Sequence, residues 1–169
     1  MPDIDRFTHN PELPAVSDVI PHQPPHLWLD GVSEVTGGEA FGFWTPGDEH
    51  YDGHFDYTDE DPETAITILP GVIQIEATAQ LGAYALLLEE PDKIPLLTSV
   101  GSRHEQPVFP GQTLGLHMVF TERERRGFVG RGEVTVDGEL TTAVRIAGRL
   151  VTRRAAEKLL RPRGRQSEL

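Results

Sequence analysis

The sequence contains no cysteine and no apolar stretch of membrane-spanning length. The absence of cysteine excludes disulfide bonds, thiolate metal sites and a cysteine nucleophile. The most apolar segment, which begins at Pro70, is interrupted by Gln74, Glu76 and Gln80, whereas a membrane helix needs about 20 mostly apolar residues. The N-terminal residues lack the basic and then apolar regions that are typical of a signal peptide. We therefore expect a cytoplasmic protein that has no membrane partner.

Basic residues are also scarce, since 15 Lys and Arg stand against 27 Asp and Glu, and the formal net charge is −12. This charge argues against nucleic acid as a partner, because binding its phosphates needs clustered Lys and Arg. Residues 48–63 carry eight acidic side chains and no Lys or Arg, whereas residues 153–165 carry six Lys or Arg. Such runs are most often solvated surface. The more specific hypotheses are that the acidic run forms a lid, and that the basic run forms a surface for a phosphopantetheine arm or an acidic carrier protein.

The length of 169 residues and a hydrophobic content of 37% suit one domain with a sizeable core. We expect this domain over residues 1–152, beginning with a proline-rich wrap. Residues 153–169 would form a basic C-terminal tail, with a short helix over residues 155–160 or no regular structure.

Hydrophobic periodicity and turn signals predict one helix and six strands. The expected helix covers residues 71–89 and is stopped by Pro91, and Asp137-Gly138 is a strong hairpin signal. The expected strands cover residues 27–35, 39–45, 95–107, 112–125, 128–136 and 140–152. A helix that is apolar on nearly every side needs a sheet to cover it, which predicts an α+β domain with an antiparallel sheet curled around the helix.

The start of this helix combines features that suit catalysis. Pro70 fixes φ for a first turn, and Gly71 allows close approach of a ligand, toward which the first N–H groups and the helix dipole would point. Glu76 lies on the second turn, where burial would favour the protonated, proton-donating form. Gln80, one turn further, could hydrogen-bond Glu76. The alternative interpretation of Glu76 is a buried carboxylate in a structural network.

His54 is the candidate base, because it follows Gly53 and shortly precedes the helix. Most loop histidines are surface or structural residues, and this remains the alternative for His54. A base, an acid and helix N–H donors are the groups needed to remove a proton α to a thioester carbonyl while a β-hydroxyl leaves as water. No phosphate loop, nucleophile elbow or metal-ligand spacing is present in the sequence, so we expect no metal and no cofactor.

Four motifs occur in one order along residues 19–152. They are Ile20-Pro21-His22-Gln23-Pro24-Pro25-His26-Leu27-Trp28-Leu29-Asp30, Gly53-His54-Phe55, Leu69-Pro70-Gly71-Val72 with Glu76-Ala77-Thr78-Ala79-Gln80, and Gln106-Pro107-Val108-Phe109-Pro110-Gly111. In these motifs the chain resembles the (3R)-hydroxyacyl-acyl carrier protein dehydratases (FabZ/FabA-like) of the hotdog-fold superfamily. The resemblance implies a curved antiparallel sheet wrapped around one long central helix.

The resemblance also implies roles for single residues. His54 would abstract the α-proton, Glu76 would protonate or anchor the departing hydroxyl, and the Gly71 amide would bind the thioester carbonyl. Gln80 would hold the acid, and Phe55 and Val72 would bind the substrate. The substrate would be a 3-hydroxyacyl group on acyl carrier protein or CoA, in fatty acid or polyketide metabolism.

In the resembled family the active sites are shared between the subunits of a homodimer, which can assemble further. The chain departs from the family pattern at Asp56, which replaces a proline, and in a longer, acidic loop over residues 56–67 that could be a lid or could displace His54. Two alternatives stay open. One is a hotdog thioesterase in which Glu76 activates water, and the other is a non-catalytic subunit that binds acyl thioesters or a carrier protein.

Overall fold

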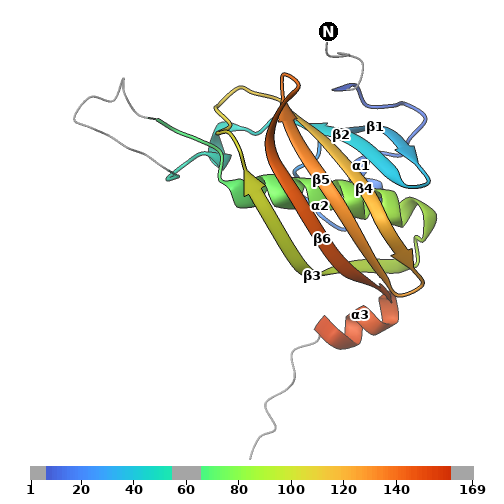
Figure 1. Cartoon of the computed structure of the whole chain (residues 1–169). Coiled ribbons are helices and arrows are strands. Elements are labelled where there is room, and N and C mark those ends of the chain that lie inside the picture. The colour runs from blue at the N-terminus through green and yellow to red at the C-terminus, as the bar shows by residue number, and fades with distance from the viewer. Residues whose placement is uncertain (1–6, 55–65, 161–169) are drawn as a thin grey trace, which may run out of the picture.

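Six antiparallel strands curl around one long helix in the computed structural model, which describes residues 7–54 and 66–160 (Figure 1). The order of the strands across the sheet is β1-β2-β4-β5-β6-β3. The predicted α+β architecture is confirmed. The elements are α1 (Val16–Val19), β1 (Gly31–Thr36), β2 (Glu39–Trp44), the 3-10 helix η2 (Asp48–His50), α2 (Gly71–Glu89), β3 (Lys93–His104), β4 (Leu114–Glu124), β5 (Gly127–Val136), β6 (Glu139–Thr152) and α3 (Arg153–Leu160).

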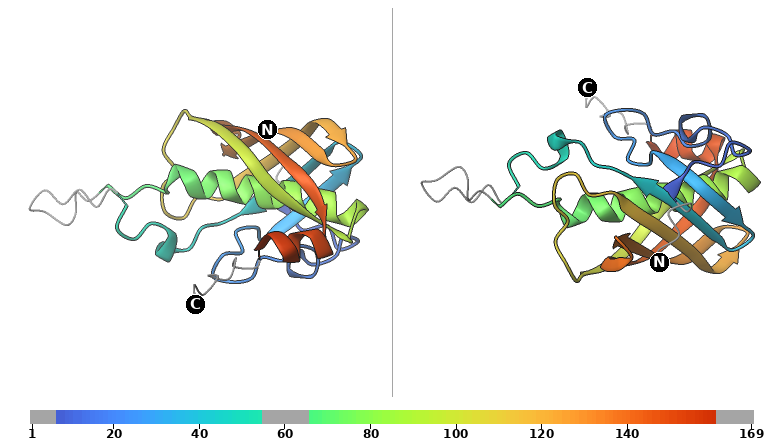
Figure 2. Two further views of the ribbon diagram at one scale, coloured as in Figure 1. Left: turned by 90° about the horizontal axis from the view of Figure 1, so that it is seen from below. Right: turned by 90° about the horizontal axis from the view of Figure 1, so that it is seen from above.

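Helix α2 links the two ends of this sheet. The chain runs from the β1–β2 hairpin at one edge of the sheet through α2 to β3. Strand β3 pairs with β6 and forms the opposite edge. Register shifts interrupt four of the strand pairs, and such bulges bend a strand and increase its twist. The bent sheet surrounds α2, while the N-terminal segment lies on the side of the helix away from β5 and β6 (Figure 2).

The turn chemistry at Asp137-Gly138 is as predicted, because both residues have positive φ, 51° and 84°, between β5 and β6. The first strand begins later than predicted, at Gly31. Trp28 is not part of the strand, because its N–H donates to the Gln80 side chain at 2.8 Å, and the first N–H bound to β2 is that of Asp30, which donates to the Phe43 carbonyl at 3.0 Å. Strand β3 ends earlier than predicted, at His104, because the N–H groups of residues 105 and 106 both turn to the Thr141 carbonyl.

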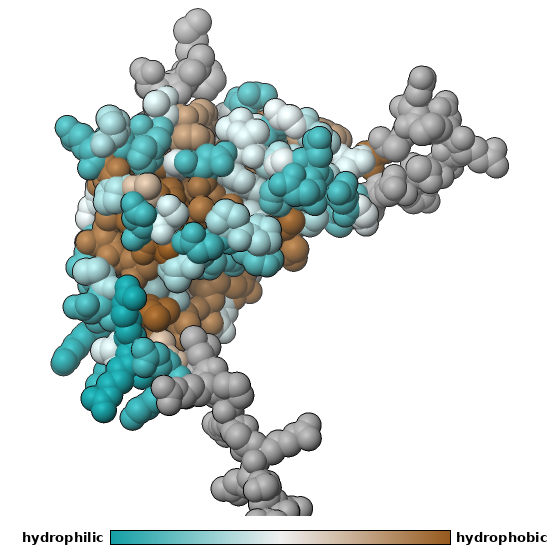
Figure 3. Space-filling model, turned by 180° about the vertical axis from the view of Figure 1, so that it is seen from behind, coloured by the Kyte–Doolittle hydropathy of each residue, from teal (hydrophilic) through white to brown (hydrophobic). Residues whose placement is uncertain are grey.

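Helix α2 is enclosed on one side only. Ala77, Leu81 and Tyr84 are fully buried against the sheet, but Val72 is 70% exposed. The predicted burial on all sides is therefore wrong, because the six strands of one chain do not close around the helix. Seen from behind, apolar surface runs across the middle of the molecule (Figure 3). Contrary to the expectation from the sequence, α2 is long and apolar enough to cross a membrane, but 67% of its apolar window is buried inside the protein, as in a core helix.

Short segments at both ends of the described chain complete the packing. Helix α1 contacts α2, and its Val16 is buried together with the following Ile20. The Tyr84 hydroxyl donates to the Pro14 carbonyl at 2.6 Å, so the N-terminal segment is tied to the central helix. At the other end α3 contacts β3 and β6 and buries Ala156.

We expect Tyr84→Phe to lower the free energy of unfolding at neutral pH by about 1 kcal/mol, because it removes the hydrogen bond to Pro14. Burial raises the pKa of the Tyr84 hydroxyl above its ordinary value of 10.0. The unfolded chain therefore ionises first as the pH rises through about 10, and the contribution of the neutral hydroxyl is lost there. Urea denaturation should show the gap between wild type and Tyr84→Phe shrinking above about pH 10. A gap that stays constant would contradict this account.

Candidate active site

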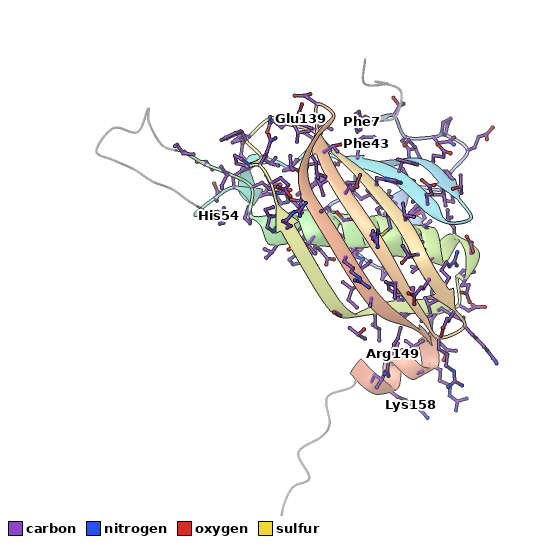
Figure 4. All side chains as sticks on the ribbon, in the orientation of Figure 1. Phe7, Phe43, His54, Glu139, Arg149 and Lys158 are labelled. Atoms are coloured by element: carbon purple, nitrogen blue, oxygen red, sulfur yellow. The ribbon has the colours of Figure 1, made fainter. Side chains whose placement is uncertain are left out.

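His54 is held beside the start of α2 by a short anchored turn. Tyr51, which follows η2, is buried, and its hydroxyl donates to the Phe109 carbonyl at 3.0 Å. Burial, and then the charge of Asp48, raise the pKa of this hydroxyl and keep it a neutral donor. The His54 N–H donates to the Tyr51 carbonyl at 3.1 Å. His54 accordingly lies next to the N-terminal end of α2, at the end of the molecule away from Lys158 (Figure 4).

The hydrogen bond of the His54 ring determines which nitrogen is basic. Its Nδ1 lies 2.9 Å from the Ile68 carbonyl oxygen. A carbonyl can only accept, so Nδ1 carries the hydrogen in the neutral ring and Nε2 carries the lone pair. Ile68 is itself fixed, because the N–H of the next residue, Leu69, donates to the Val108 carbonyl at 2.8 Å. The turn before the helix thus orients the imidazole as a base.

A cavity of about 480 Å³ joins this imidazole to the helix start. Its lining residues are His54, Ile68, Leu69, Gly71, Val72, Gln74, His104, Glu105, Gln106 and Pro107. The first N–H groups of a helix have no acceptor within the helix, and the dipole is positive at this end. The structure therefore brings together three of the predicted site residues, His54, Gly71 and Val72. Phe55 and residues 56–65 of the acidic loop predicted over 56–67 lie outside the described residues, as do tail residues 161–169.

Glu76 lines a different cavity of the same chain, of about 230 Å³. Most of the lining of this second cavity is apolar, with Ala79, Ala83, Leu96, Leu97, Phe128 and Ile146 among its residues. The Glu76 side chain is 37% exposed, so its predicted burial is wrong for the single chain. The reason is that Glu76 lies on the same uncovered face of α2 as Val72, four residues earlier.

Gln80 connects Glu76 to the N-terminal segment. Its Nε2 donates to Glu76 Oε1 at 3.2 Å and to the His26 carbonyl at 2.9 Å. Its Oε1 accepts the N–H of Trp28 at 2.8 Å. Gln80 is only 1% exposed, and these bonds satisfy its buried amide. The contact between Gln80 and Glu76 that the sequence suggested is present.

Two histidines that were not singled out from the sequence belong to these cavities. His22 Nε2 lies 3.4 Å from Glu76 Oε1, and its Nδ1 is buried without a hydrogen-bond partner among the described residues. His104, at the end of β3, lines the cavity of His54. The motif around Pro21 contains His22, but no spacing rule places it near Glu76. Within residues 7–54 and 66–160, no group of three or more His, Asp or Glu side chains is arranged to hold a metal ion.

Comparison with known sequences finds a FabA-like domain over residues 20–145. The chain is 36% identical over 133 residues to the 3-hydroxyacyl-acyl-carrier-protein dehydratase FabZ of Bacillus velezensis, covering 74% of this chain and 87% of that protein. It is 35% identical over 147 residues to the protein of the same name from Thermomicrobium roseum, covering 83% and 93%.

Solved structures share the fold. The dehydratase heterocomplex ApeI:P from Xenorhabdus doucetiae matches with a TM-score of 0.69 at 19% identity, over 89% of this chain and 99% of that chain. Thioesterase HI1161 from Haemophilus influenzae matches with a TM-score of 0.57 at 13% identity, over 72% and 78%. At such low identities these similarities establish the hotdog fold alone. Together with the domain match and the curated relatives, they lead to one conclusion: the chain belongs to the FabA-like family.

Proposed function

We propose that this chain dehydrates a 3-hydroxyacyl thioester of acyl carrier protein to the trans-2-enoyl thioester, in fatty acid metabolism. The observation that carries the proposal is the His54 imidazole, oriented with a basic Nε2 in the same cavity as the start of α2, in a chain whose relatives bear the name of this dehydratase. CoA as the carrier, a polyketide pathway and a cytoplasmic location stay predictions from the sequence.

In the proposed reaction His54 Nε2 removes the proton from the α-carbon of the substrate. The electron pair of that C–H bond forms the double bond as the C–O bond at the β-carbon breaks. The thioester carbonyl gains negative charge in the transition state, and the N–H groups of Gly71 and Val72 stabilise it. Glu76 gives its proton to the departing hydroxyl, which leaves as water. Proton transfer from His54 back to Glu76 restores both groups.

The placement of the two groups in separate cavities supports an active site shared between two chains. His54 lies in the cavity at the helix start, and Glu76 lies in the apolar cavity further along α2. A second copy that covers the exposed face of α2 would bury Glu76 and set its carboxyl group opposite the other chain's His54. The apolar cavity beside Glu76 would then extend the site for an acyl chain.

Strand β3 is the surface best suited to receive that second copy. It is a 12-residue edge strand, and an unpaired edge of this length is a template for pairing with another chain. Leu97 and Val100 on this strand are 41% and 45% exposed. Antiparallel pairing of two β3 strands would join the two sheets and cover these side chains. We propose a homodimer as the active form, and the dimer as the unit of any larger assembly.

We expect His54→Asn and Glu76→Gln each to lower kcat/KM for hydration of a crotonyl thioester roughly 10²–10⁴-fold. Asparagine can still donate to the Ile68 carbonyl but lacks the basic nitrogen, and glutamine keeps the shape of Glu76 without its proton. The control is His117→Asn, because His117 contacts Glu39 and Phe41 on β2.

Activity that survives in His54→Asn or Glu76→Gln would show that this mechanism is wrong. Release of free thiol from a saturated acyl thioester, measured with a thiol reagent, would identify a thioesterase. Binding of acyl thioesters without turnover would identify a non-catalytic subunit.

Mixing the two inactive variants tests whether the site is shared. Random exchange between His54→Asn and Glu76→Gln dimers makes half of the dimers mixed, and each mixed dimer would hold one intact site. We expect recovery of about a quarter of wild-type activity after co-refolding. A site built within one chain would give no recovery at any mixing ratio.

Val100→Lys tests the β3 interface, because it places a charge at the centre of the proposed strand pair. We expect sedimentation equilibrium to show a shift from dimer to monomer, with loss of activity in proportion to the monomer. Leu159→Lys is the matched control, since Leu159 is 68% exposed on α3. A dimer that persists unchanged in Val100→Lys would locate the interface elsewhere.

A further inference from the structure

His104 lies directly against the start of α2. A side chain at position 71 would meet the His104 ring, whose Cε1 lies 2.5 Å from the place where a Cβ would stand. Gly71 is therefore the residue that lets the imidazole rest on the first turn of the helix. His104 and His54 line the same cavity. A second imidazole consequently stands next to the N–H groups that would bind the thioester carbonyl.

Buried hydrogen bonds fix the state of this ring. The Thr142 hydroxyl donates its only hydrogen to Gln74 Oε1 at 2.7 Å, so it must accept the hydrogen of His104 Nδ1 at 2.9 Å. Thr142 is fully buried and Gln74 is 3% exposed, so the Nδ1 edge of the ring is anchored to the core while the rest of the side chain stays exposed. Nε2 of the neutral ring is then an acceptor. Its contact is Ser102 Oγ at 3.4 Å, which is long for a hydrogen bond.

The two imidazoles of the cavity differ in depth. In the single chain His54 is half-buried, whereas His104, the last residue of β3, is exposed and is followed by Glu105 and Gln106, which line the same cavity. The reacting carbons of a bound thioester must reach the half-buried His54. The thiol part of the substrate, on the other side of the carbonyl, would then lie nearer the solvent, at the level of His104. A pantetheine arm presents amide N–H donors there. His104 Nε2 is an acceptor at this level of the cavity.

We propose that His104 is a specificity residue for the carrier arm, with Nε2 accepting a hydrogen bond from an amide N–H of the pantetheine chain. The inference rests on the proposed function, because it uses the thioester placed by Gly71 and His54. The acceptor recognises the arm that is common to acyl carrier protein and CoA. His104 thereby sets the affinity for carrier-linked substrates without taking part in the chemical step.

His104→Phe tests this assignment, because phenylalanine keeps an aromatic ring on Gly71 and removes both nitrogens. Hydration of a crotonyl group is measured on three thiols of decreasing length: pantetheine, N-acetylcysteamine and ethanethiol. We expect the variant to raise KM for the pantetheine thioester roughly three- to tenfold with kcat nearly unchanged, and to leave kcat/KM for the ethanethiol ester as in wild type. His117→Phe is the matched control, because His117 lines none of these cavities.

Thr142→Val provides a second variant, because it removes the acceptor of Nδ1 while keeping the shape of the side chain. In this variant KM should again rise for the pantetheine thioester and stay unchanged for the ethanethiol ester, but the increase should be smaller than in His104→Phe. An equal loss on all three thioesters would overturn the proposal, since it would mean that His104 acts on the reacting centre or supports the helix start. Unchanged kinetics on all three would overturn it as well.

Binding measurements separate this inference from the proposed function. If the wild-type protein hydrates none of the thioesters, the proposed function fails, and calorimetry with a non-reactive pantetheine thioether still measures affinity for the arm. Weaker binding in His104→Phe, with equal binding of wild type and His117→Phe, would then support the assignment. Equal binding by all three proteins would overturn it.

Discussion

The start of α2 is the point on which the arrangement of the candidate site depends. The segment before the helix is tied by Leu69 to the Val108 carbonyl, and the carbonyl of Ile68 orients the His54 ring. His104 rests on Gly71 from the side of β3. Contacts from three parts of the chain therefore position one helix terminus, whose N–H groups and dipole favour negative charge. The chemistry proposed for this protein follows from placing an oriented base beside that terminus.

Two buried glutamines on α2 connect the helix to the rest of the site. Gln74 accepts hydrogen bonds from Thr141 and Thr142 on β6, and through Thr142 it holds His104. Gln80 binds the N-terminal segment and Glu76. Each glutamine thus serves one of the two cavities. Buried amides need partners, so the residues that satisfy them are also the residues that keep the functional side chains in place.

The curvature of the sheet determines which face of α2 stays uncovered. Six strands cover one side of α2 and leave Val72 and Glu76 on an uncovered face, while β3 remains an open edge. Both features are costly for an isolated chain, since they expose apolar surface and unpaired strand groups. Pairing with a second copy would remove both costs at once, and it would complete the site in the proposed scheme. In that scheme the uncovered face of α2 and the open edge of β3 account for both the assembly and the shared active site.

The sequence by itself determined the α+β class, the central helix and the presence of six strands, because periodicity, Pro70 and Asp137-Gly138 are local signals that need no tertiary information. It did not indicate the short helices α1 and η2. It also singled out His54, Gly71 and Gln80, whose motifs are contiguous. It could not place His22 against Glu76 or His104 against Gly71, since these contacts join residues far apart in the chain. It misjudged the burial of Glu76 for a related reason. An apolar helix indicates that it will be covered, but only the tertiary structure decides which side its own sheet covers.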